Sequence, residues 1–268
     1  MRNLLHANLR RLVRSRAFLI ALLAELVYVA LTVLSCWDHC AAGDQYTLEY
    51  ILTAGYVLLG YLPIPTLILA PLLSLHLGAD YGNSTLRNKL VVGHTRRSVY
   101  LADLLACAVT AVALDMLYLA LSGLLCVRPI LEISGRLLRF SPGQVLLWAA
   151  VLLLARAAWA AVVKLVVTVL GNRTAASIAV LLLAVAAALI STAGIDEVGY
   201  LSRNLMLEGN AGRMTCWQLT LDVLPTGQYY QVSRLDTPNL WRMPLMSLAV
   251  IAASTGAGLA LFRSRDLK

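Results

Sequence analysis

The run VLLWAAVLLLARAAWAAVVKLVVTVL at residues 145–170 is followed, after the tetrapeptide GNRT at 171–174, by a second apolar run, AASIAVLLLAVAAALISTA, at residues 175–193. A helix needs about 20 apolar residues to cross a bilayer core roughly 30 Å thick, and each run is long enough. Backbone groups in lipid must be hydrogen-bonded within their own segment, so helices are expected. Strands of a membrane barrel would alternate in polarity over about ten residues, and these runs do not. The sequence here predicts two membrane helices joined by a short polar turn.

The same pattern extends along the whole chain of 268 residues, of which 60% are hydrophobic and only 13% are charged. A soluble domain carries about 25% charged residues. Six segments are apolar enough to span a membrane: 17–36, 51–77, 99–127, 145–170, 175–193 and 245–262. We therefore predict an all-α, polytopic membrane protein with six transmembrane helices, in which residues 1–268 form a single transmembrane domain.

Lys and Arg are concentrated in residues 1–16, 78–98, 171–174 and 263–268, which would all lie on one side of such a membrane protein. Basic residues favour the cytoplasmic side, so both termini and the loop 78–98 are predicted to be cytoplasmic. The net charge is +8, but the basic residues cluster at the ends of apolar segments and form no single stripe of the kind that binds nucleic acid. We expect a multi-pass protein of the cell (plasma) membrane with no nucleic-acid partner.

The N-terminal residues 1–16 carry Leu4, Leu5, Leu9 and Leu12 at near-helical spacing among five arginines. Two interpretations remain open. The segment is either a short amphipathic helix that anionic lipid attracts to the inner membrane face, or only a charged flank of the first span. Membrane lipid is an expected partner in both.

The predicted outer face includes the loop 194–244, which is too polar to span a membrane and contains Trp217 and Trp241. Because Trp and Tyr favour the membrane interface, short helices resting on the membrane surface are expected there. Four cysteines are also predicted at or beyond this face: Cys36, Cys40, Cys126 and Cys216. They either form disulfides, with three possible connectivities for two bridges, or stay reduced.

Charged residues inside the predicted spans are costly and are the first candidates for function. They are Glu25, Asp103, Asp115, Arg156 and Lys164. At a rise of about 1.5 Å per residue, Asp115 and Arg156 lie roughly 23–25 Å from the inner boundary, and the other three within about 7–14 Å of it. This predicts an Asp115–Arg156 pair and a pair of Lys164 with Glu25 or Asp103. Such pairs either fix helix packing, which we favour, or line a substrate path.

Signatures of catalysis are absent from the sequence. It contains no phosphate-cradling G-x-x-x-x-G-K-[ST] loop, no H-E-x-x-H and no G-x-S-x-G. The four histidines, His6, His39, His76 and His94, are scattered over both predicted faces and make an unlikely metal site. We expect a protein that is not an enzyme and that binds no metal or cofactor itself.

The inner loop contains the run DYGNSTLRNKLVVGHTRRSVYL at residues 80–101. Its basic residues suit a short helix presented to an acidic partner or to lipid headgroups, although a solvated positive loop would look the same. The run resembles the ABC-2-type ABC transporter permease family, in which an acidic residue, a G-T-[IL]-R-N-K-L-like run and G-x-[ST]-R occupy this loop. The tail FRSRDLK at 262–268 and LPTGQ at 224–228 resemble weaker family elements.

This resemblance implies the permease subunit of an ATP-driven exporter of peptide antimicrobials, drugs or similar amphiphiles. A separate cytoplasmic ABC ATPase subunit would bind ATP and Mg, and a second permease, identical or related, would complete the path. In the family this loop carries a coupling helix that docks on the ATPase. By position, the ATPase-docking residues here would be Asp80, Gly82, Thr85, Arg87, Asn88, Lys89, Gly93, His94 and Arg96.

Two other classes of function remain open. The buried Asp115 and Arg156 could serve an ion-coupled secondary transporter or a membrane enzyme. The chain could also be a membrane anchor or sensor whose outer loop binds a ligand. Neither of these alternatives requires an ATPase partner, which separates them from the permease hypothesis.

Overall fold

The computed structural model describes residues 2–42, 64–82, 85–134, 142–203, 210–233 and 240–264, and all regular structure in these ranges is α-helical. The helices are α1 (Arg2–Val13), α2 (Arg16–Ala42), α5 (Ile64–Gly82), α6 (Thr85–Val91), α7 (Arg96–Ser134), α8 (Pro142–Leu170), α9 (Arg173–Arg203), α10 (Asn210–Val223), α11 (Pro225–Ser233) and α12 (Arg242–Ser264). The predicted all-helical class is confirmed for this part of the chain.

Among the described residues, five helical segments are long and apolar enough to cross a membrane. They are Arg16–Leu34, Arg96–Leu125, Leu146–Leu170, Arg173–Arg203 and Arg242–Ser264. These segments match five of the predicted spans and are typical of a helical membrane protein. The remaining predicted span, 51–77, is described only from Ile64 onward, as part of α5.

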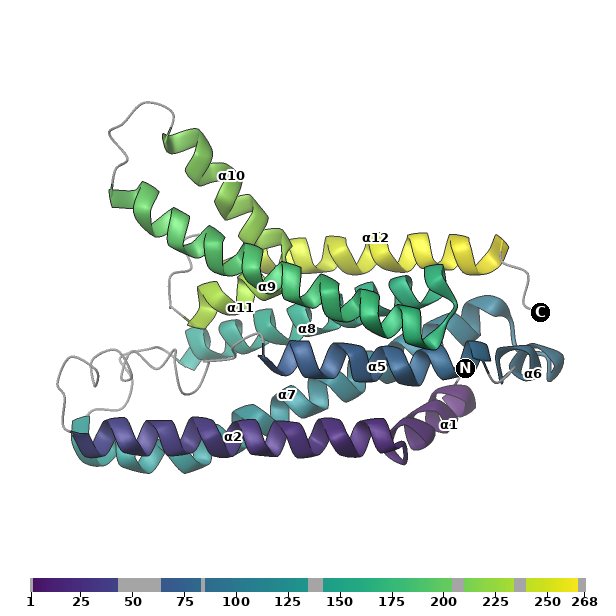
Figure 1. Cartoon of the computed structure of the whole chain (residues 1–268), viewed down its shortest axis with the longest axis horizontal. Helices are drawn as coiled ribbons and strands as arrows, with labels where there is room; N and C mark the ends of the chain where they lie inside the picture. The colour runs from purple at the N-terminus through teal and green to yellow at the C-terminus, as the bar shows by residue number, and fades with distance from the viewer. Residues whose placement is uncertain are drawn as a thin grey trace.

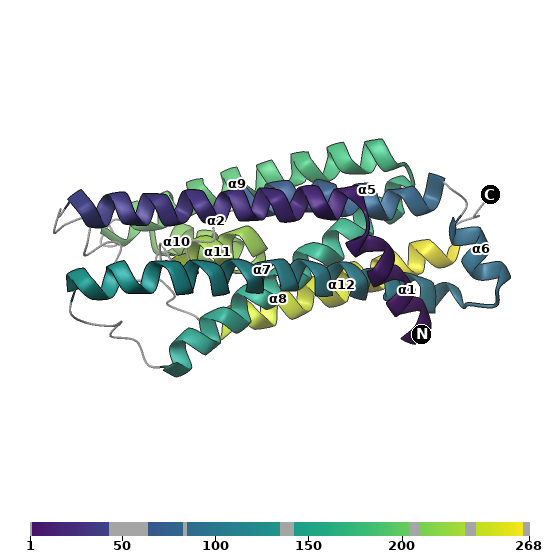
Figure 2. The same cartoon turned by 90° about the horizontal axis from the view of Figure 1, so that it is seen from below.

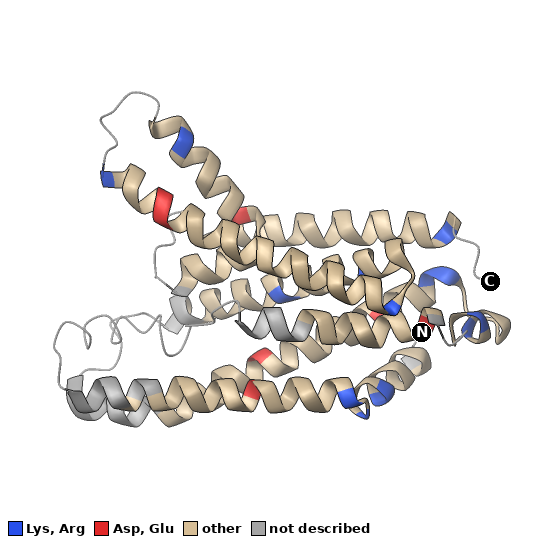
Figure 3. Cartoon of the chain, viewed as in Figure 1, with Lys and Arg blue, Asp and Glu red and all other residues tan. Residues whose placement is uncertain are grey.

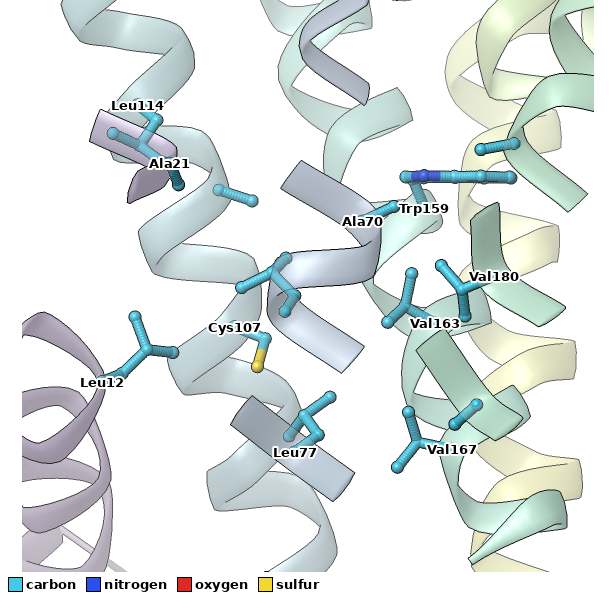
Figure 4. Packing of buried hydrophobic residues seen from close by; sticks show 14 of the residues in the cluster. Leu12, Ala21, Ala70, Leu77, Cys107, Leu114, Trp159, Val163, Val167 and Val180 are labelled. Atoms are coloured by element: carbon cyan, nitrogen blue, oxygen red, sulfur yellow. The ribbon is translucent and has the colours of Figure 1, made fainter. Parts of the chain in front are cut away.

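The long helices lie side by side as an elongated bundle (Figures 1 and 2). Helix α8 packs along α12, α9 packs along α5, and α2 packs along α7. The largest buried cluster joins α1, α2, α5, α7, α8 and α9 through small and branched side chains such as Ala70, Ala111, Val163 and Val180 (Figure 4). Large apolar side chains remain exposed along α2 and α9, including Leu23 and Leu189 at 64% and 66%, as expected for surfaces that face lipid.

Three turns gather at the end of the bundle that holds α1, α6 and the last turn of α12. Ser15 lies between α1 and α2 and caps α2, because its Oγ accepts a hydrogen bond from the Phe18 amide at 3.1 Å. Asn172 caps α9 by accepting from the Thr174 amide at 2.9 Å. Thr95 caps α7 in the same way. The chain reverses before two of these caps at glycines with positive φ. Gly93, at 98°, precedes Thr95, and Gly171, at 60°, precedes Asn172.

At the opposite end, α9 continues beyond its predicted span and forms a hairpin with α10 that leans away from the bundle (Figure 1). Gly194 permits this contact, since a Cβ there would lie 2.9 Å from the Trp217 ring. An ion pair between Arg213 and Glu197 also joins the two helices. Helix α11 then packs against α8 and α9, so this short helix of the loop 194–244 forms part of the bundle.

Candidate functional site

The short helix α6 lies between α5 and α7 at the end of the bundle where basic residues gather (Figure 3). Its Leu86 is only 2% exposed and belongs to a buried cluster that also includes Leu4 of α1 and Val99 of α7. Its other side bears exposed Arg87 and Asn88. The helix ends at Val91, and Val91 and the following Val92 are 79% and 78% exposed. Helix α6 therefore has an inner face fixed to the bundle and an outer tip that is partly apolar.

Lys89 fixes the inner face of α6. Its Nζ lies 3.0 Å from Asp80 Oδ2 on α5 and 3.1 Å from Asp103 Oδ1 on α7. Arg11 on α1 donates to the same Asp80 oxygen at 2.7 Å. Lys164 on α8 donates to Asp103 Oδ2 at 3.0 Å. The resulting chain of alternating charges, Arg11–Asp80–Lys89–Asp103–Lys164, runs from α1 through α5, α6 and α7 to α8; we call it the charge network.

Both carboxylates of the charge network are almost completely buried, with 2% of each side chain exposed. Asn8 completes the shell of Asp103 by donating to its Oδ1 at 2.7 Å. Burial by itself would raise the pKa of Asp80, but the hydrogen bond from Arg11 and the charge of Lys89 outweigh it and hold this pKa below its usual value. Burial opposes the charge of Arg11 too, yet its pKa is raised because of Asp80. Arg11 and Asp80 thus each favour the ionised form of the other.

Of the residues predicted to face an ATPase, Arg87 and Asn88 are exposed, and Thr85 begins α6. Asp80 and Lys89 point inward to the charge network, with 2% and 11% of their side chains exposed. The loop pattern could not show this, because it fixes the spacing of the two side chains and not the direction in which they point.

The remaining predicted docking residues lie before and after α6 in the chain. Gly82 is the last residue of α5. Gly93 supplies the positive φ, and His94 is half-buried beside it. Arg96 reaches across to α12 and donates to the carbonyls of Phe262 at 3.3 Å and Arg263 at 2.9 Å. This contact ties the start of α7 to the end of α12.

The charges predicted inside the spans are all buried. Arg156 Nε donates to Asp115 Oδ2 at 2.8 Å, and Lys164 selects Asp103 rather than Glu25. The guanidinium of Arg156 also lies 5.3 Å from the ring centroid of Tyr229, which links this pair to α11. Glu25 on α2 is 5% exposed.

Sequence reasoning did not identify the packing role of the LPTGQ element at 224–228. Thr226 and Ser191 of α9 share a hydrogen bond of 2.8 Å. A Cβ on Gly227 would lie 2.5 Å from the Leu221 carbonyl oxygen. Gln228 donates to the Asp222 and Met243 carbonyls at 2.6 and 3.1 Å and accepts from Ser247 at 2.9 Å. The element therefore holds α9, α10, α11 and α12 together. The sequence signal for this role was the presence of two hydrogen-bonding side chains, Thr226 and Gln228, on either side of a glycine.

Within the described part of the chain, no group of three or more His, Cys, Asp or Glu side chains could hold a metal ion. Cys107 and Cys216 carry free thiols in the structure. The side chains of Cys36, Cys40 and Cys126, and that of His39, lie outside the described residues.

No protein-family model matches the chain, and no curated protein matches it. Any functional assignment therefore depends on the residues of the chain itself, and above all on α6 and the charge network beneath it.

Proposed function

We propose that the chain is the permease subunit of an ATP-driven exporter of the ABC-2 type in the cell membrane. Separate cytoplasmic ATPase chains would bind ATP and Mg, since the sequence contains no phosphate-cradling loop. One observation carries the proposal: α6 has an outer tip available to a partner and an inner face tied by Lys89 to Asp80 and Asp103. This is the arrangement needed to convert movement of a partner into movement of membrane helices.

The outer tip suits a protein partner. Val91 and Val92 are among the most exposed large apolar residues of the chain, yet they lie at the end of the bundle where basic residues gather. Exposed apolar residues beside polar ones mark interaction sites, and an apolar anchor with a flanking cation fits a partner cleft. Arg87 and Asn88, exposed on the same short helix, would give the contact its polar rim.

The inner face suits transmission of force. A displacement of α6 would move Lys89, and two buried carboxylates would have to follow it or lose a charged partner. An unpaired buried charge is costly, so the network resists separation. Asp80 would carry the displacement to α5 and α1, and Asp103 would carry it through Lys164 to α8. ATP-driven closure of the partner would in this way change the spacing of the helices.

We further propose that two such permeases, identical or related, form the path between them, and that the cargo is a peptide antimicrobial, a drug or a similar amphiphile. Both statements follow from the family resemblance of the loop, with the N- and C-termini cytoplasmic. Six spans, with 51–77 as the second, complete this topology.

An ion-coupled secondary transporter is the second candidate, and the buried Asp115 favours it, because carboxylates at membrane depth form proton relays. Its hydrogen bond with Arg156 at 2.8 Å offsets the carboxylate's charge, which favours a packing role. The two candidates differ in their energy source. Transport in proteoliposomes that needs an ion gradient and no ATPase would establish the second candidate.

Affinity purification tests the first proposal. The tagged chain would be expressed with its neighbouring reading frames, purified in mild detergent and analysed by mass spectrometry and an ATPase assay. We expect an ATPase to co-purify, to be lost in the Arg87→Glu/Val91→Asp variant and to be retained in Arg97→Glu, a matched change at exposed Arg97 on α7. A pure, stable chain without an ATPase beside every candidate frame would contradict the permease proposal.

A further inference from the structure

Helix α1 presents rows of side chains spaced four residues apart, and neighbouring rows differ sharply in chemistry. The rows are Leu4, Asn8 and Leu12; Leu5, Leu9 and Val13; and His6, Arg10 and Arg14. The first row is buried, at 2–6% exposure. The second is apolar and partly exposed, with Val13 at 48%. The third is exposed along its whole length and basic.

The orientation of these rows is fixed by the bundle. Asn8 donates to Asp103 at 2.7 Å and Arg11 donates to Asp80 at 2.7 Å, so two buried carboxylates hold α1 from the inner side. Leu4 and Leu12 belong to buried clusters with α7. Helix α1 therefore cannot roll to bury its basic row, and the apolar row stays beside it at the surface.

The position of α1 places these two rows at a membrane boundary. The chain bends at Ser15, and α2 begins at Arg16. Within the next two turns Leu19, Ile20 and Leu23 are 55–64% exposed, in a segment apolar enough to span a membrane. Hydrocarbon would therefore begin within about one helical turn of Arg16, at roughly 1.5 Å per residue.

We infer that the outer rows of α1 bind the headgroups of anionic phospholipids. The basic row would contact the phosphates, and the partly exposed apolar row would enter the boundary between headgroups and acyl chains. An acidic soluble partner would match the basic row alone and would leave the apolar row in water. This lipid surface is separate from the contact proposed for α6, and it holds whichever mode of transport the chain performs.

Lipid titration tests the inference directly. Dioleoyl-phosphatidylglycerol would be added to the detergent-purified full-length chain, and bound lipid would be counted by native mass spectrometry, with dioleoyl-phosphatidylcholine as the neutral probe. Each basic residue near an anionic surface contributes about fivefold in affinity, so Arg10→Gln/Arg14→Gln should weaken phosphatidylglycerol binding about 25-fold. Thermal unfolding in phosphatidylcholine should remain that of the unchanged chain, because both side chains are exposed.

The matched control is Arg97→Gln/Arg263→Gln, which removes two exposed charges from other helices and should leave phosphatidylglycerol binding within about twofold. Equal loss in both double variants, or no preference of the unchanged chain for phosphatidylglycerol, would overturn the inference. So would equally tight binding of sn-glycerol 3-phosphate, which carries the phosphate without acyl chains and would reveal a soluble-anion site.

Discussion

The ammonium group of Lys89 lies 3.0 Å from Asp80 Oδ2, and this contact joins α6 to α5. The same ammonium lies 3.1 Å from Asp103 on α7. A single side chain, 11% exposed, thus fixes the short surface helix to both of its neighbours in sequence.

Replacing Lys89 should loosen α6. In Lys89→Met both carboxylates lose a charged hydrogen-bond donor, at a cost of about 1.5–3 kcal/mol. We expect amide hydrogen exchange in residues 85–91 to become about tenfold faster or more. The control is Arg87→Met, which removes an exposed charge from the same helix and should leave exchange unchanged. Equal exchange in the two variants would show that Leu86 alone anchors α6.

Acid should weaken the charge network. The pKa of Asp80 lies below its usual value of 3.8 in the folded chain, because Arg11 and Lys89 favour the ionised form over the opposing effect of burial. The stabilisation is therefore fully present above pH 3.8 and is lost as the pH falls through the lowered pKa. Thermal unfolding between pH 2 and 6 should show a steeper acid loss in the unchanged chain than in Asp80→Asn. Parallel curves would contradict this.

The buried pair Asp115–Arg156 should act as a packing element. Removing one partner takes a hydrogen-bonded opposite charge away from a buried group, so Asp115→Leu and Arg156→Met should each cost about 3–5 kcal/mol. The double variant should recover most of this loss, because both charges of the pair are then removed together. Thermal unfolding in detergent measures the cycle, and transport by the double variant tests its meaning. If the double variant or Asp115→Asn folds and assembles normally but does not transport, the pair instead belongs to the substrate path.

The packing of α11 against α10 should depend on Gly227. In Gly227→Ala the new Cβ would lie 2.5 Å from the Leu221 carbonyl oxygen, so backbone must shift and Gln228 would lose its partners. We expect a loss of thermal stability of about 1–3 kcal/mol, as for other overpacked sites. At Gly199 on α9 a Cβ meets nothing within 4 Å, so Gly199→Ala should be neutral or stabilise by about 0.5–1 kcal/mol. Equal effects would contradict this packing.

The helical spans could be predicted because long apolar runs leave few alternatives in lipid. The predicted run 175–193 nevertheless ends ten residues before the end of α9, which continues to Arg203. Hydropathy falls at Asp196 and Glu197, but the helix persists because α10 packs on it at Gly194 and Glu197 pairs with Arg213. Apolarity marks where lipid must be, and tertiary contacts decide where a helix ends.

The candidate site could be predicted only in part. Depth along the helices suggested a pair Asp115–Arg156 and a pair of Lys164 with Glu25 or Asp103; the structure contains Asp115–Arg156 and Lys164–Asp103. Depth gives no information on which helices are neighbours, so it could not choose between Asp103 and Glu25 or identify Arg11 as the partner of Asp80. The spacing of Asn8 and Arg11 with Leu4 and Leu12 was the available signal, because it places all four on the buried side of α1.

Photo-crosslinking from the tip of α6 tests the central claim most directly. Val91, 79% exposed, would be replaced by benzoylphenylalanine in cells that express the chain with its neighbouring reading frames. Leu124, 77% exposed near the other end of α7, is the matched control position. The permease account predicts a covalent adduct between position 91 and an ATPase subunit, and none from position 124. If the chain is folded and the candidate ATPases are present but no ATPase adduct forms at position 91, the account is contradicted.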